Sequence, residues 1–264
     1  MSPFNDERSG LPPPPWHDNT CKPKGAVKTM PIYLESVATA FRLMASGDQD
    51  LMEILLLSMQ VSLTALVLSC LIGLPVGAFL ATRRFTGRGA VIGLFNALMG
   101  MPPVVVGLIV YLHLSRSGPF GWLGLLYTPN AMIIAQMLLI IPIITALSCQ
   151  IIEDLHEDYR DLFTSLAVPP GKAVKAYIID ARYSLLTVIL AGFGRAISEV
   201  GAVIVVGGNI DHLTRVMTTT IALETSKGEL ALALALGVIL LIIALAVNML
   251  ASWLKSRASR RAYA

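Results

Sequence analysis

Five long apolar runs constrain the fold of this chain more than any other feature of its sequence. The runs cover residues 53–81, 89–114, 130–152, 184–207 and 230–254. Each is long enough to cross a membrane, because an α-helix needs about 20 residues to span a hydrocarbon core of about 30 Å. The chain is 55% hydrophobic and only 14% charged, which is unusual for a soluble domain. We therefore predict an all-α integral membrane protein with five spans.

The basic residues between the runs predict the orientation, because cytoplasmic loops carry the excess of Lys and Arg. The segments after the first, third and fifth runs hold Arg83, Arg84, Arg88, Arg160, Lys172, Lys175, Arg182, Lys255, Arg257, Arg260 and Arg261. The segments after the second and fourth runs hold only Arg116, Arg215 and Lys227. We place the N-terminus outside and the C-terminus in the cytoplasm, although the segment before the first run is basic too. The net charge of +3 then reflects membrane topology, and nucleic-acid binding is not needed to explain it.

The two ends of the chain differ from the apolar runs. Residues 1–29 are rich in Pro and polar residues and have no apolar period, which predicts a disordered tail. Residues 30–50 place apolar side chains at helical spacing, which favours an interfacial helix over a plain leader without membrane contact. A start of translation at Met30 is a further hypothesis. The membrane domain is predicted at 51–254, and a basic cytoplasmic tail at 255–264.

The fourth run differs from the others because it contains two opposite charges, Arg195 and Glu199. Ionisable groups at membrane depth cost roughly 2.5–3.5 kcal/mol each, so they normally face a bundle interior or a water-filled path. In one continuous helix, these two residues share an arc with the small residues Gly194, Ser198 and Ala202. The arc is either a packing face on which the charges neutralise each other, or the wall of a path for a polar substrate. Both interpretations hold if a second copy of the chain packs across a central path.

A turn is predicted directly after the fourth run, at residues 207–209. Its backbone amides form either an anion-binding nest or a simple helix stop. The candidates for a translocation path are therefore Gly194, Arg195, Ser198, Glu199, Ala202 and Asn209.

The connection between the third and fourth runs, residues 153–183, is far more charged than its surroundings. Leu155, Leu162, Phe163 and Leu166 predict an amphipathic helix, which the Pro-Pro-Gly sequence at 169–171 ends before a second helix begins. Loops longer than about 12–15 residues are usually functional, so a protein-docking surface is favoured over a solvated connection.

Two motifs carry a resemblance to a known family. The stretch GRAISEVGAVIVVGGNI (194–210), with its continuation to residue 228, resembles permease subunits of ABC importers for molybdate, tungstate and sulfate, most of all the tungstate type. MPPVVVGLIVYLHLSRSGPFG (101–121) is similar to the same group. The connection 153–183 resembles the family's "EAA" coupling loop, with Asp161 in place of its Glu, Leu162 and Phe163 in place of two Ala, and Ala167 in place of its Gly. Asp180 stands where a Pro is usual.

The resemblance covers about residues 53–254 and implies a MetI-like bundle in the cell inner membrane that works as a homodimer. It also implies two partners: a cytosolic ABC ATPase docked on the loop, and an external binding protein that delivers a small tetrahedral oxyanion. No G-x-x-x-x-G-K-[ST] sequence occurs, so the ATPase partner is expected to bind ATP, and we expect no cofactor in this chain. The expected coupling residues are Asp158, Arg160, Asp161, Ala167, Pro169, Pro170, Gly171 and Lys172.

Two other classes of function compete with a transport subunit. An intramembrane hydrolase needs a nucleophile and a base at membrane depth, but only His113 lies in a run and no G-x-S-x-G occurs. The three Cys residues show no disulfide or metal spacing. A passive anion channel would explain the charged fourth run but leaves the charged loop unexplained.

Overall fold

The structure, a computed structural model, describes residues 38–39 and 49–262. The predicted tail 1–29 and nearly all of the predicted interfacial helix 30–50 lie outside the described residues. Within them the fold is helical and contains no strand. The helices are α2 (Gln49–Thr82), α3 (Arg88–Met99), α4 (Pro103–Leu114), the 3-10 helix η1 (Gly121–Leu123), α5 (Pro129–Ser165), α6 (Pro170–Asp180), α7 (Arg182–Ser198), α8 (Gly201–Gly207), α9 (Met217–Lys227) and α10 (Leu230–Ala262).

Three of these helices, α2, α5 and α10, are long and apolar enough to cross a membrane unbroken. Two bent pairs pass the same test together: α3 with α4, at 101°, and α6 with α7, at 71°. The described part of the chain therefore offers three spans, or up to five if each bent pair counts as one. A helix suits this role because its backbone groups are satisfied within the segment.

The second predicted run is not one helix, because the chain breaks between Met99 and Pro103. Pro102 and Pro103 lack the backbone N–H that a continuous helix would need, and Pro103 instead occupies the first turn of α4, where no donor is required. By contrast, α2 and α5 continue through Pro75 and Pro142. Among the prolines in the predicted spans, the adjacent pair Pro102 and Pro103 coincides with the break between α3 and α4.

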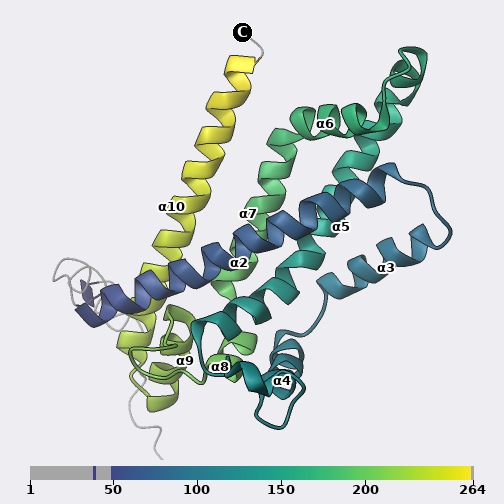
Figure 1. Ribbon diagram of the computed structural model, residues 1–264. Helices are drawn as coiled ribbons and strands as arrows, with labels where there is room; N and C mark the ends of the chain where they lie inside the picture. The colour runs from purple at the N-terminus through teal and green to yellow at the C-terminus, as the bar shows by residue number, and fades with distance from the viewer. Residues whose placement is uncertain (1–37, 40–48, 263–264) are drawn as a thin grey trace, which may run out of the picture.

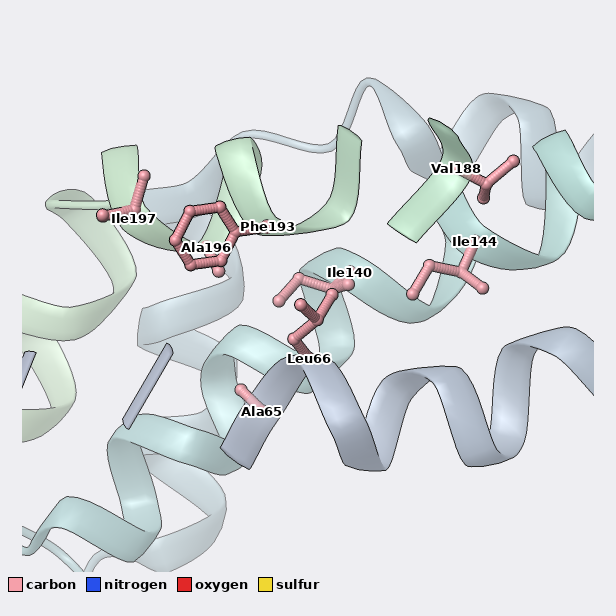
Figure 2. Packing of buried hydrophobic residues seen from close by; sticks show 8 residues of the cluster. All are labelled: Ala65, Leu66, Ile140, Ile144, Val188, Phe193, Ala196 and Ile197. Atoms are coloured by element: carbon pink, nitrogen blue, oxygen red, sulfur yellow. The ribbon is translucent and has the colours of Figure 1, made fainter. Parts of the chain in front are cut away.

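The core lies between α2, α5 and α7. Figure 2 shows one cluster of buried side chains from these helices: Ala65, Leu66, Ile140, Ile144, Val188, Phe193, Ala196 and Ile197. Close approach of α2 to α5 depends on Gly77, since a Cβ atom there would overlap Ser148 Oγ and lie 2.8 Å from the Thr145 carbonyl oxygen. Small residues commonly allow this kind of contact between membrane helices.

Figure 1 shows how the elements divide between the two ends of the molecule. α6 and the C-terminal end of α10 lie at one end of the molecule, and α4, α8 and α9 gather at the other. This division matches the two sets of connecting segments from which the orientation was predicted. Which end faces the cytoplasm stays a prediction.

Three helical extents differ from the sequence-based expectation. α5 runs on to Ser165, so the expected first helix of the 153–183 connection is the end of α5 and not a separate element. α10 continues to Ala262 and includes most of the segment predicted as a tail. α9 was not foreseen; its backbone is anchored by a hydrogen bond that the Met217 N–H donates to Ser58 Oγ of α2, at 2.8 Å.

Candidate functional site

The expectation of one continuous helix over residues 184–207 is wrong, because α7 ends at Ser198 and α8 begins at Gly201. Glu199 between them is extended, with φ −77° and ψ 124°. Its carboxylate folds back over α8, where Oε1 accepts the Ala202 N–H at 3.1 Å. The carboxylate thereby satisfies one of the free donors at the start of α8.

Two side chains from other elements stabilise this break. Gln136 of α5, which is buried, donates from Nε2 to the Ala196 carbonyl at 3.2 Å. Thr218 of α9 donates from Oγ1 to the Glu199 carbonyl at 3.0 Å. An interrupted helix inside a membrane protein is stable only where protein groups satisfy the freed backbone, and these contacts do so.

The two charges of the fourth run form the pair that one of the two interpretations predicted. Arg195 Nη2 lies 3.3 Å from Glu199 Oε2. The Glu199 side chain is only 4% exposed, whereas the Arg195 side chain is 31% exposed. The pair therefore extends from the protein interior to the surface, with its cationic member outermost.

The surface of α7 beside Arg195 is open. A Cβ atom added at Gly194 would lie more than 4 Å from all other described parts of the chain beyond its own helix surroundings. Ser198 is exposed and donates from Oγ to the Arg195 carbonyl at 3.2 Å. Three of the path candidates, Gly194, Arg195 and Ser198, thus share the open side of α7, and Glu199 lies beneath them.

The other two path candidates lie elsewhere. Ala202 is fully buried, and its Cα would be 2.8 Å from a Cβ atom at Gly107 of α4. The expected small-residue stripe therefore ends at Ser198, because the chain leaves the helix at Glu199. Asn209 lies beyond α8 in a left-handed turn, at φ 51°, after Gly208 at φ 71°.

Sequence reasoning missed a group of buried polar residues around Glu199. Ser58 and Ser62 of α2, Gln136 of α5 and Thr218 of α9 line a small cavity together with the Glu199 side chain. Gln136 Oε1 has no hydrogen-bond partner among the described residues. The signal that could have found them is their polarity within apolar runs, the same argument that singled out Arg195.

The predicted coupling segment, residues 153–183, forms an elbow that consists of the end of α5 and of α6 and leads into α7 (Figure 1). The end of α5 is closed by hydrogen bonds from Val168 N–H to the Phe163 carbonyl, at 3.0 Å, and from Ala167 N–H to the Thr164 carbonyl, at 3.1 Å. Ala167 itself adopts φ 46°, the left-handed region that favours glycine. This is the position where the resemblance in sequence places a Gly in other members.

Aromatic side chains join the two arms of the elbow, which are α6 and the end of α5. Tyr177 of α6 is buried, and its ring centroid lies 5.5 Å from that of His156 and 5.4 Å from that of Phe163. His156 Nδ1 and the Tyr177 hydroxyl are 2.9 Å apart, and Tyr159 donates to Asp180 Oδ2 at 2.7 Å. These contacts make the end of α5 and α6 one packed unit.

The tip of this elbow is exposed and charged. The exposed residues include the expected coupling positions Asp158, Arg160, Asp161, Ala167, Pro169, Gly171 and Lys172. Pro170 begins α6. Of the four apolar residues expected on one face, Leu155 and Phe163 pack against the core, whereas Leu162 and Leu166 are 50% and 65% exposed. The tip therefore combines charges with two exposed leucines.

A second polar contact joins the turn before α9 to the first turns of α2. His212 Nδ1 donates to Glu53 Oε2 at 2.8 Å, which joins the start of α2 to the turn before α9. The hydrogen bond to Glu53 raises the pKa of His212, and Asp211 and Asp50 raise it further. Arg215, which pairs with Asp211 at 2.6 Å, is the neighbouring cation.

These features define a class: a helical membrane protein with a charge pair at a helix break and an exposed, charged elbow at one end. Comparison with known proteins identifies the family. Residues 73–260 match the family described as binding-protein-dependent transport system inner membrane component. The chain belongs to this family and is an inner membrane transport component.

Individual relatives cover most of the chain. It is 40% identical over 225 residues to a probable anion ABC transporter permease protein of Haloferax volcanii, covering 82% of this chain and 97% of the relative. It is 38% identical over 219 residues to the tungstate uptake system permease protein TupB of Peptoclostridium acidaminophilum, covering 81% and 96%. A TupB from Campylobacter jejuni is 41% identical over 157 residues, covering 60% and 66%.

Proposed function

We propose that this chain is the permease subunit of an ATP-driven importer for a small tetrahedral oxyanion, and that the oxyanion is tungstate. The observation that carries the proposal is the half-open pair of Arg195 and Glu199 at the break after α7. A cation on the open side of the helix suits an anionic passenger, and its buried partner keeps the site from holding the anion too tightly. Identity to relatives named as tungstate uptake permeases supports tungstate over molybdate or sulfate.

The path itself needs a second copy of the chain. One copy offers at most five candidate spans within the described residues, and the open side of α7 beside Gly194 is left uncovered. We propose a homodimer in which the two α7 helices face each other across the path. Gly194, Arg195 and Ser198 line it, and Glu199 positions Arg195 from beneath.

A separate cytosolic subunit would hydrolyse ATP, and the elbow would transmit the resulting movement to the membrane helices. In this proposal the ATPase docks on the exposed tip at residues 158–172. The aromatic contacts of Tyr177 transmit the movement of the ATPase to α6 and α7. The break at Glu199 lets α7 tilt relative to α8, so that the open side faces outward or inward in turn. An external binding protein captures the oxyanion, and most selectivity resides there.

The direct test is reconstitution of the chain in liposomes with its ATPase and binding protein. We expect tungstate-loaded binding protein to stimulate ATP hydrolysis more than the molybdate or sulfate forms. Greater stimulation by molybdate or sulfate would reassign the substrate. Uptake that proceeds without nucleotide would instead support the passive channel.

The docking assignment has its own test. Reversing a charge at the tip, as in Arg160→Glu or Asp161→Lys, should uncouple ATP hydrolysis from uptake without unfolding the chain. Arg116→Glu is the matched control, because Arg116 is also exposed but follows α4 at the other end of the fold. If the tip variants transport as well as the control, the elbow is not the docking site.

A further inference from the structure

An apolar cavity lies in the angle between the elbow and the end of α2. Its walls are formed by Leu74 and Phe79 of α2, Val174 and Ile178 of α6, and Leu185 of α7. The cavity has a volume of about 420 Å³, within the range of roughly 300–1,000 Å³ typical of small-molecule sites. It is separate from the charge pair at the helix break, and Gly171 is the residue that it shares with the exposed tip of the elbow.

The cavity is open on one side, and its apolar side chains are exposed there. Phe79 is 56% exposed and Ile178 is 43% exposed. Exposed apolar side chains of this size mark contact with lipid or with another molecule. Because they belong to the end of a membrane-spanning helix and to the elbow, they lie where the hydrocarbon layer gives way to head groups.

The rim of the cavity carries one kind of charge. Arg83, directly after α2, is the charged residue that lines this cavity, and the described lining contains no acid. Arg83 is exposed and forms no ion pair with the described residues. Its neighbour Arg84 faces a different, polar cavity, where Arg88 and Arg160 are balanced by Glu153, Glu157 and Asp161.

We propose that this cavity binds an anionic phospholipid of the inner leaflet, with the phosphate on Arg83 and an acyl chain along the walls of α2 and α6. The proposal uses the orientation predicted from the basic residues. Basic pockets between membrane helices on the cytoplasmic side are suited to anionic head groups. The acyl chain covers the exposed Phe79 and Ile178, which no described part of the chain covers.

The site has a consequence for the movement of the elbow. Val174 and Ile178 belong to α6, Leu185 belongs to α7, and these two helices meet at 71°. A lipid held in this angle resists its closure. The anionic lipid content of the bilayer then sets how readily the elbow moves.

The test measures lipids retained by the full-length protein, purified from nanodiscs of phosphatidylglycerol or phosphatidylcholine, by native mass spectrometry. We expect retention of phosphatidylglycerol but not of phosphatidylcholine. Arg83→Ala should weaken retention about fivefold, the change expected if one basic residue contributes about 1 kcal/mol. Arg84→Ala, at the adjacent exposed arginine outside the cavity, should leave retention unchanged.

A second pair of variants tests the apolar wall. Ile178→Trp adds bulk inside the cavity and should abolish retention, whereas Ile179→Trp places the same side chain at a position that is 49% exposed but does not line the cavity. Circular dichroism and elution volume show whether each variant is folded. Equal retention of both lipids, or equal effects of the two arginine variants, would overturn the proposal. So would crosslinking of the Ile178→Cys variant, through its new thiol, to a second copy or to the ATPase, since a protein would then fill the cavity.

Discussion

Replacing Glu199 by Gln removes the buried negative charge but leaves a side-chain oxygen for the Ala202 amide. In the native chain, Oε2 of Glu199 lies 3.3 Å from Arg195 Nη2. Two unit charges at that distance attract by about 5 kcal/mol at an effective dielectric constant of about 20. Solvent screens part of this, because the Arg195 side chain is 31% exposed. Since breaking a fully buried pair costs about 3–5 kcal/mol, we expect Glu199→Gln to lower the free energy of unfolding by about 3 kcal/mol.

A double-mutant cycle isolates the interaction between the two charges. Glu199→Gln, Arg195→Gln and the double variant are unfolded by denaturant in detergent micelles, and their free energies of unfolding are compared with that of the native chain. We expect a coupling energy of about 2 kcal/mol, so that the double variant loses about 2 kcal/mol less than the sum of the losses in the two single variants. If Glu199→Gln stays within about 0.5 kcal/mol of the native chain, the pair does not stabilise the break.

Three further perturbations follow from the geometry. Gly107→Ala should lower the free energy of unfolding by about 1–3 kcal/mol through overlap with the backbone of α8, whereas Gly194→Ala should be neutral or slightly stabilising; equal losses would contradict the packing described. Ala167→Gly should raise the free energy of unfolding by about 1 kcal/mol, because it relieves the backbone strain of a left-handed alanine at the end of α5. A lower free energy of unfolding would show that Ala167 is unstrained. The pair of His212 and Glu53 should stabilise the fold fully below about pH 6.5 and cease to do so as pH rises through the raised pKa of His212. Thermal unfolding of His212→Gln should therefore differ from that of the native chain at pH 6 but not at pH 9, and a constant difference would refute the assignment.

Run length and polarity were sufficient to predict the three unbroken membrane helices α2, α5 and α10, because the bilayer fixes both the length and the composition of a span. The break at Glu199 could not be predicted in the same way. It is stabilised by Gln136, 60 residues before the carbonyl that it contacts, and by Thr218, 19 residues after Glu199. A helical projection treats the segment in isolation and cannot include such partners.

The candidate site shows the same division. Gly194, Arg195 and Ser198 were placed together correctly on α7 because they precede the break, whereas Ala202 follows it and packs against α4. At the elbow, the Pro-Pro-Gly sequence predicted the stop. The left-handed conformation of Ala167 gave no local signal, since alanine favours a helix.

The central claim, that the chain is the permease of an ATP-driven tungstate importer, is tested most directly by measuring tungstate accumulation in proteoliposomes. The liposomes contain the chain with its ATPase, and tungstate-loaded binding protein is added on the side opposite the ATPase. The account predicts accumulation against a concentration gradient that requires ATP hydrolysis. Tungstate that only equilibrates across the membrane, at a rate independent of nucleotide, would contradict it.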